Sequence, residues 1–125
     1  MTRSRQALGA FGERYAAAYL ARAGYRIVAR NVRLPSGEID IVAEDGDTLA
    51  FVEVRTRRGD RFGSPEESVT RAKAQRLIDL GHQYLQAHDT ASRAWRIDVL
   101  ALSVDRQGKV SRAALIKNAI GQGDQ

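Results

Sequence analysis

The segment around Asp45-Gly46-Asp47 constrains the fold more than any other part of this chain. On either side of it, residues Glu38–Glu44 and Thr48–Arg57 are rich in the β-branched and aromatic residues that favour strands. An Asp-Gly pair between two such runs signals a β-hairpin, because glycine readily adopts the positive φ of tight turns. The sequence therefore predicts two antiparallel strands joined by a short loop.

Carboxylates lie on both arms of this hairpin. Side chains alternate along a strand, so Glu38 and Asp40 share one face of the first arm, and Glu53 and Arg55 share one face of the second. A loop with an even number of residues would bring Asp40 and Glu53 to the same side, directly opposite for four residues and diagonal for two. An odd number would send them to opposite faces. Like charges facing each other across a sheet repel, and a bound divalent cation would relieve that repulsion.

The first helical pattern adds a third acid. It covers roughly Ala7–Ala23 and ends at Gly24, where a left-handed residue is expected after a helix. Glu13 falls on the same alanine-rich face as Ala16 and Leu20, a face that should pack inward. A carboxylate there costs free energy unless it is paired, hydrogen-bonded or bound to a metal.

The remaining patterns complete an α/β fold. They predict a strand at Tyr25–Val32, a helix at Ser68–Ala87, a strand at Trp95–Leu102 and a last strand around Val110–Ile116. Within Trp95–Leu102, Asp98 faces away from its apolar neighbours and is expected to pair with an arginine or to orient the site. The order α-β-β-β-α-β-β predicts a mixed sheet with helices packed on it. We expect one domain over residues 1–125, with 1–6 and 118–125 as flexible tails.

Composition narrows the classes of function. The 125 residues include no cysteine, which excludes disulfides, thiolate zinc sites and cysteine nucleophiles, and which suits a cytoplasmic protein. No apolar run is long enough for a membrane span, and no secretory signal is recognisable. The net charge is +5, and arginine outnumbers lysine among the 20 basic residues. This bias favours a polyanionic partner, although a general preference for arginine codons would produce it as well.

The acids and arginines together suit phosphodiester chemistry. Oxygen ligands favour Mg²⁺ or Mn²⁺, which can activate water and stabilise charge on phosphorus. Basic residues near the second strand are suited to holding a nucleic-acid backbone: Arg55, Arg57, Arg58, Arg61 and Arg71. The alternative is that each triplet of charged residues is a solvated strand face with cross-strand ion pairs.

Several segments resemble one family. GEIDIVAEDGDTLAFVEVRTR, residues 37–57, is similar to the core motif of the PD-(D/E)XK nuclease superfamily. More narrowly, it resembles the YraN-like family of small bacterial proteins, often called endonuclease-like. Three other segments match that family too: GERYAAAYL (12–20), FGSPEESVTRAKAQRLIDLGHQYL (62–85) and RIDVLAL (96–102).

The resemblance implies a restriction-endonuclease-like fold, a central mixed β-sheet flanked by helices. It also implies that Glu13 is the helix acid, Asp40 the metal-bridging aspartate and Glu53 the second metal carboxylate, with Glu38 as an adjoining acid behind the ligands. Arg55 stands where the superfamily has a lysine. That departure matters because arginine effectively cannot be deprotonated.

Arg55 can still orient the scissile phosphate or stabilise charge in the transition state. Lys73, on the helix face that also carries Leu77, Leu80 and Tyr84, is the candidate for a migrated catalytic lysine. The other interpretation is that Lys73 extends along the edge of the core to reach solvent.

The leading hypothesis is a metal-dependent nuclease acting on DNA. Two alternatives belong to other classes: a non-catalytic nucleic-acid-binding module with a degenerate nuclease site, and an adaptor for a protein partner. A subunit of this size offers a small footprint, so a homodimer on a two-fold substrate is compatible with the sequence.

Overall fold

In the computed structural model of this chain, the described residues are 2–59, 69–88 and 93–120. The order of the elements is α-β-β-β-α-β-β, as predicted. Their bounds are α1 Thr2–Arg22, β1 Arg26–Leu34, β2 Gly37–Asp45, β3 Thr48–Arg58, α2 Arg71–Ala87, β4 Trp95–Val104 and β5 Val110–Ile116.

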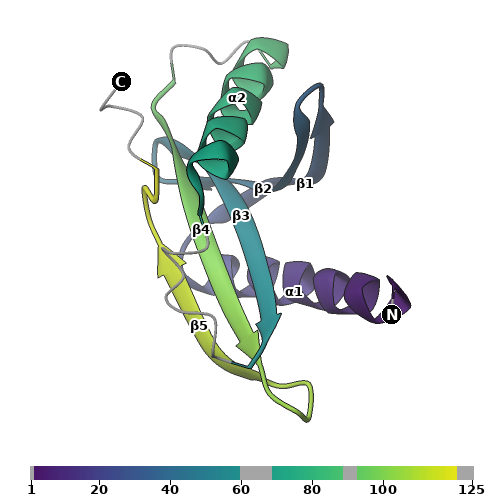
Figure 1. The fold of residues 1–125 in the computed structure, drawn as a ribbon. Coiled ribbons are helices and arrows are strands. Elements are labelled where there is room, and N and C mark those ends of the chain that lie inside the picture. The colour runs from purple at the N-terminus through teal and green to yellow at the C-terminus, as the bar shows by residue number, and fades with distance from the viewer. Residues whose placement is uncertain (1, 60–68, 89–92, 121–125) are drawn as a thin grey trace.

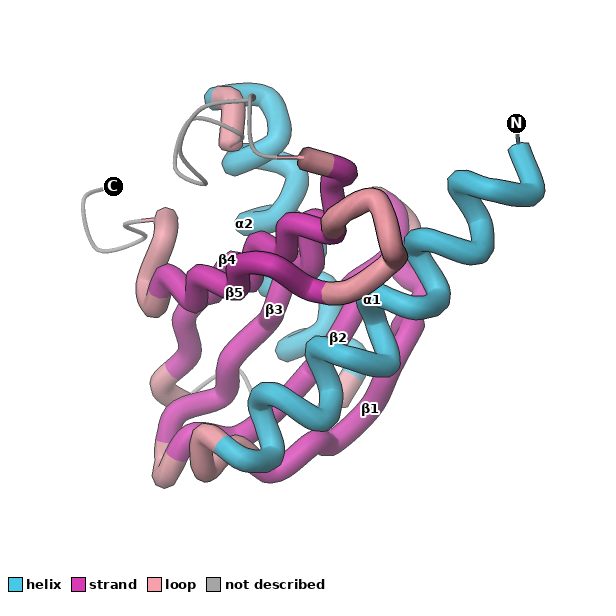
Figure 2. The backbone as a smooth tube through the Cα atoms, turned by 90° about the horizontal axis from the view of Figure 1, so that it is seen from below, coloured by secondary structure: helices cyan, strands magenta, loops and turns pink. Residues whose placement is uncertain are grey.

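The five strands form one mixed sheet in the order β1-β2-β3-β4-β5. Only β3 and β4 pair in parallel; the other neighbours are antiparallel. Parallel neighbours need a crossover connection, and α2 lies within the connection from β3 to β4. Helix α1 covers one face of the sheet and α2 the other (Figures 1 and 2). The predicted α/β architecture is therefore confirmed.

Each helix packs on its own apolar cluster. Ala16 and Leu20 of α1 are fully buried against even-numbered residues of β3 and β4, whereas Leu80 and Tyr84 of α2 pack on odd-numbered ones. This follows from alternation along the strands. The strand residues concerned are Ala50, Val52, Leu100 and Leu102 beneath α1, and Leu49, Phe51 and Ile97 beneath α2.

Two boundaries differ from the sequence prediction. Helix α1 begins at Thr2, five residues before the predicted start at Ala7. Arginine and glutamine are good helix formers, and the apolar pattern that marked Ala7 reports packing and not helicity. At the other end, Ile120 is buried in the α2-side core, within the segment expected to be a flexible tail.

Helix α2 begins at Arg71, with Thr70 as its N-cap: the Thr70 hydroxyl accepts a hydrogen bond from the Lys73 backbone N–H at 3.2 Å. The Ser64-Pro65-Glu66-Glu67 segment, whose sequence resembles a capping box, lies outside the described residues. Within the described part of the chain, no helix has the length and apolar character needed to cross a membrane.

The β2–β3 turn consists of Gly46 and Asp47, with Asp45 paired to Thr48. Gly46 has φ +63°, the conformation that favours glycine. This register would set Asp40 directly opposite Glu53. The diagonal offset expected for a two-residue loop is wrong, because the turn is centred one residue later than Asp45-Gly46.

Candidate metal centre

Strand β2 changes face at Asp40. Ile39 packs with the α2-side cluster and Ile41 with the α1-side cluster, although residues two apart in a regular strand share a face. The irregularity has a counterpart in β1. Asn31 lies between the pairs that flank Asp40, and it has φ +53°, which is uncommon outside glycine. The backbone rotation there lets Asp40 lie between the two faces of the sheet.

The β2–β3 ladder also ends next to Asp40. The last pair is Ile41 with Val52, and beyond it the Asp40 carboxylate replaces the missing strand partner. Its Oδ2 accepts a hydrogen bond from the Val54 backbone N–H at 2.8 Å. Asp40 is thereby fixed at the mouth of the gap where β2 and β3 separate.

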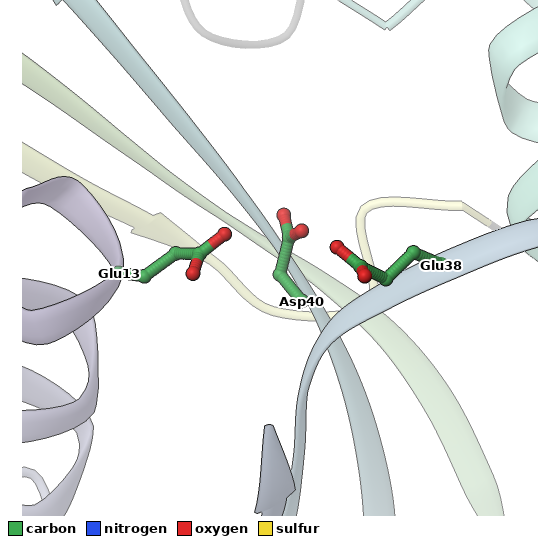
Figure 3. Close-up of side chains that lie close together, drawn as sticks. All are labelled: Glu13, Glu38 and Asp40. Carbon is green, nitrogen blue, oxygen red and sulfur yellow. The ribbon is translucent and has the colours of Figure 1, made fainter. Parts of the chain in front are cut away.

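Three acids converge at this gap. One carboxylate oxygen from each of Glu13, Glu38 and Asp40 lies within 4.8 Å of the others. Figure 3 shows Asp40 in the middle, with Glu13 reaching in from α1 and Glu38 approaching from β2. The donor set is all oxygen, which is the chemistry that Mg²⁺ and Mn²⁺ prefer.

A pocket of about 420 Å³ opens beside these acids. Its walls come from α1, β2 and β3, and they combine acidic, basic and small side chains. The lining residues are Leu8, Gly9, Glu13, Asp40, Glu53, Val54, Arg55 and Thr56. Acids predicted from three separate segments therefore reach one pocket.

The electrostatics of Asp40 reflect this crowding. Burial raises its pKa most, followed by the negative charge of Glu53 and then those of Glu13 and Glu38, to about 7. The hydrogen bond from Val54 opposes the shift. Nearby like charges favour the protonated form of a carboxyl group, and a cation would reverse that effect.

Glu53 lies close to Asp40 but outside the three-acid cluster. Its carboxylate is 3.8 Å from the Arg55 guanidinium, and the two side chains are 12% and 19% exposed. The acids that lie mutually close are thus Glu13, Glu38 and Asp40, and Glu53, which we expected as a ligand, is not among them. Glu38 is 38% exposed and lies 3.7 Å from Arg33.

A close contact between α1 and β3 sets the height of Glu13 over the sheet. A Cβ built on Gly12 would lie 2.0 Å from the Thr56 Oγ1, so only glycine fits there without movement. Gly12 precedes Glu13 directly. The sequence prediction missed this pair, and its signal is a glycine inside an otherwise regular helix.

Lys73 faces the same region from α2. Burial lowers its pKa, and the positive charge of Arg55 lowers it further, whereas Glu53 raises it. Arg76 and Arg57 also lie close enough to lower it. The side chain is half-buried, as its position beside Leu77 predicts.

The other predicted basic residues lie in different parts of the structure. Arg57 is half-buried on the face of Arg55, whereas Arg58 lines a separate pocket with Asp105 and Arg106. Arg71 lines a third pocket, under the first turn of α2. Arg61 lies outside the described residues. Among the predicted arginines that the structure describes, Arg55 thus lines the acidic pocket, and Arg57 lies close enough to Lys73 to lower its pKa.

Asp98 forms a different network. Fully buried, it accepts hydrogen bonds from Tyr25 Oη at 2.9 Å, from Arg96 Nε at 2.9 Å and from the Asn118 backbone N–H at 2.8 Å. The predicted pairing with an arginine is confirmed. Asp98 is absent from the lining of the acidic pocket.

Fold and site together define an α/β protein in which a mixed sheet between two helices carries an acidic pocket where two central strands separate. The chain belongs to a family described as "Uncharacterised protein family UPF0102", whose model matches residues 12–102. This is the YraN-like family that the motifs predicted, and that prediction is confirmed.

Related proteins align with most of this chain. A UPF0102 protein of Moorella thermoacetica is 49% identical over 119 residues, which cover 95% of this chain and 99% of the relative. One of Chloroflexus aurantiacus is 47% identical over 123 residues, covering 98% and 99%. One of Roseiflexus castenholzii is 53% identical over 105 residues, covering 83% and 85%.

Proposed function

We propose that this protein is a metal-dependent nuclease that hydrolyses DNA phosphodiester bonds at the pocket between α1, β2 and β3. The observation that carries the proposal is the convergence of Glu13, Glu38 and Asp40 to within 4.8 Å in a partly buried setting. Such a cluster is costly in a metal-free protein, since like charges there repel with little screening. A divalent cation supplies the missing positive charge.

Each acidic residue of the pocket has a role in this proposal. Asp40, Glu13 and the adjoining Glu38 would hold the metal ion, with Glu53 as a further carboxylate beside Asp40. When bound, Mg²⁺ or Mn²⁺ would lower the pKa of a coordinated water and stabilise the charge that develops on phosphorus. The hydrogen bond from Val54 to Oδ2 orients the Asp40 carboxylate and would leave its Oδ1 available to a metal ion.

Two basic side chains, Arg55 and Lys73, are assigned to the phosphate. Arg55 is recessed in the pocket wall, where its guanidinium can bind phosphate oxygens in a bidentate manner but cannot act as a base. Lys73 faces Arg55 and Glu53, and the lowered pKa of its ammonium supports a role in proton transfer. We therefore assign phosphate positioning to Arg55 and the migrated lysine's role to Lys73.

The test combines metal binding with cleavage. Calorimetric titration with Mn²⁺ should show binding to the wild type and none to Asp40→Ala. In Mg²⁺ or Mn²⁺ the wild type should cleave single-stranded, nicked or branched DNA, and Asp40→Ala should not, while its unfolding stays cooperative. A wild type that binds no Mn²⁺ and cuts none of these substrates would refute the proposal.

A non-catalytic DNA-binding module is the second candidate, because Arg55 takes the place of the lysine and lies against Glu53. Such a protein would bind DNA in a salt-dependent way without cleaving it. An adaptor for a protein partner would need an exposed apolar patch. Among the described residues the exposed large apolar side chain is that of Val28 alone, so this role gains no support.

A further inference from the structure

The end of the β1–β2 hairpin, which carries Glu38, is supported by the sheet from one side. The described pairs between β2 and β3 begin at Ile41, which lies opposite Val52, whereas β1 pairs with β2 as far as Leu34 and Gly37. Residues 37–39 therefore take their backbone partners from β1. A strand end held from one side can bend unless another element supports it.

Helix α2 supplies that support through Gln83. The side-chain Oε1 of Gln83 accepts a hydrogen bond from the Ser36 backbone N–H at 3.0 Å, and its Nε2 donates one to the Ser36 Oγ at 2.6 Å. Ser36 lies in the turn between β1 and β2. Figure 1 shows the joined ends of the two strands beside α2. Because hydrogen bonds are directional, two of them to one amide group fix the orientation of the turn as well as its distance from the helix.

An apolar contact accompanies these hydrogen bonds. A Cβ built on Gly37 would lie 4.0 Å from both methyl carbons of Leu80. Leu80 and Gln83 are three residues apart and so lie on one side of α2. Leu80 is itself buried in the α2-side core, so the helix is firmly seated at this level. Residues 36 and 37 are thus held against α2 by polar and apolar contacts together.

The position of this hairpin end determines where Glu38 lies. Ile39 packs in the α2-side cluster, so the preceding Glu38 points to the opposite face, where α1 carries Glu13. Glu38 contributes one of the three carboxylates whose oxygens lie within 4.8 Å of one another (Figure 3). A shift of the hairpin end relative to α2 would therefore change the separation between Glu38 and Glu13.

The other two acids of the cluster have supports of their own. Asp40 accepts the hydrogen bond from Val54 of β3, and Glu13 belongs to α1, which packs directly on β3. Glu38 lies 3.7 Å from Arg33, but Arg33 is on β1 and would move with the hairpin. Glu38 is thus the acid whose position depends on the contact with α2.

We propose that Gln83 is a positioning residue: by holding the β1–β2 turn against α2, it keeps Glu38 within reach of a divalent cation bound by Glu13 and Asp40. The metal part of this inference rests on the proposed function. The holding of the hairpin end does not, since neither Ser36 nor Gln83 belongs to the acidic cluster.

Two measurements on the whole protein test the inference. In EDTA, amide hydrogen exchange followed by NMR should be faster at Ser36 and at residues 37–39 in Gln83→Ala, because the hydrogen bonds to α2 are lost. In a calorimetric titration, Gln83→Ala should bind Mn²⁺ about tenfold more weakly, the lower end of what lost supporting contacts cost a metal site. Ser36→Ala keeps the backbone hydrogen bond and should lose less affinity. Gln86→Ala, at an exposed position of the same helix, is the matched control and should behave like the wild type in both measurements.

A double-mutant cycle separates positioning from a general loosening of the fold. Glu38→Gln removes one charge from the cluster and should itself weaken Mn²⁺ binding. In that background, Gln83→Ala should weaken binding little further, because the carboxylate that it positions is gone. An equal loss of affinity in both backgrounds would overturn the inference, since Gln83 would then influence the site by another route.

The two measurements also distinguish this inference from the proposed function. If the wild type and Gln83→Ala bind Mn²⁺ equally well, Gln83 does not position Glu38, and the proposed function stands. If the wild type binds no Mn²⁺, the proposed function and the metal role of Gln83 are both refuted. In that case the exchange rates still decide whether Gln83 holds the hairpin end, and unchanged rates would refute that part as well.

Discussion

At Asp40, a charge that the proposed function needs also destabilises the folded protein. Its pKa is raised to about 7, mainly by burial and by Glu53. Between the ordinary value of 3.8 and about 7, the folded state binds more protons than the unfolded state, so stability falls as pH rises through that range. Above it, the full cost of the buried charge is present.

We therefore predict that Asp40→Asn stabilises the metal-free protein at pH 8. The amide oxygen still accepts the Val54 hydrogen bond, while the buried charge is gone. In EDTA, the difference in Tm between variant and wild type should vanish near pH 4 and grow until about pH 7. Thermal unfolding monitored by circular dichroism over this pH range measures it.

Asp47→Asn is the control, because Asp47 is exposed in the β2–β3 turn. It should leave the pH dependence of Tm unchanged. Mn²⁺ should raise the Tm of the wild type at pH 8 and not that of Asp40→Asn. If Asp40→Asn had the same pH dependence of Tm as the wild type in EDTA, burial and neighbouring charges would not destabilise the ionised Asp40.

For single residues, the sequence predicted which acids form the site but not how they are arranged. Glu13 was identified because a carboxylate on an alanine-rich helix face needs a reason. Glu38 was expected beside the ligands, but its place in the three-acid cluster, where we expected Glu53, was not predicted, since the backbone is irregular at Asn31 and Asp40. A single asparagine with positive φ leaves no periodic signal.

Among the elements, the contact between α1 and β3 governs the acidic pocket. Gly12→Ala would place a methyl group 2.0 Å from the Thr56 Oγ1, so α1 must move away from the sheet and carry Glu13 with it. We predict a loss of Mn²⁺ affinity of about tenfold, in line with what displaced supporting contacts cost a metal site. Calorimetric titration with Mn²⁺ measures it.

Gly9 provides the matched control in the same helix. A Cβ added there meets nothing within 4 Å, so Gly9→Ala should stabilise the protein by about 0.5–1 kcal/mol through helix propensity. Thr56→Ala removes the clashing oxygen, and the double variant with Gly12→Ala should recover most of the affinity. Equal Mn²⁺ affinity in Gly12→Ala and the wild type would show that this contact does not set the position of Glu13.

The elements themselves were largely readable from the sequence. Alternation and the Asp-Gly turn located β2 and β3, because burial on one face imposes a period of two. The start of α1 was missed by five residues, since its first turns contain few apolar residues for a periodic pattern. Local propensity and packing are separate signals, and an apolar pattern reports only the second.

Over the whole molecule, Asp98 joins segments that are distant in sequence. Tyr25 connects α1 to β1, Asp45 ends β2, and Asn118 follows β5; each contacts either Asp98 or its partner Arg96. Arg96 Nη2 also donates to Tyr25 Oη at 3.0 Å. The sequence predicted that Asp98 would pair with an arginine, but a network of this range depends on the strand order.

We predict that Asp98→Ala destabilises the fold by about 3 kcal/mol, because it leaves a tyrosine hydroxyl and a backbone N–H without their acceptor and removes one of the two carboxylates that bind the poorly exposed Arg96 guanidinium. Tyr25→Phe removes the hydrogen bonds of its hydroxyl with Asp98 and Arg96 and should cost about 1–2 kcal/mol. In the Asp98→Ala background the same change should cost less, since only the hydrogen bond from Arg96 remains to be lost. Urea unfolding of the four proteins gives the coupling energy.

The network and the acidic pocket share no residue, so the two can be perturbed separately. Among molecules that remain folded, Asp98→Ala should bind Mn²⁺ like the wild type, whereas Gly12→Ala should not. If Asp98→Ala cost less than 1 kcal/mol, the buried network would not hold these segments together. If it abolished Mn²⁺ binding in a folded protein, α1 and the acidic pocket would be coupled through Tyr25, which follows the C-terminal end of the helix.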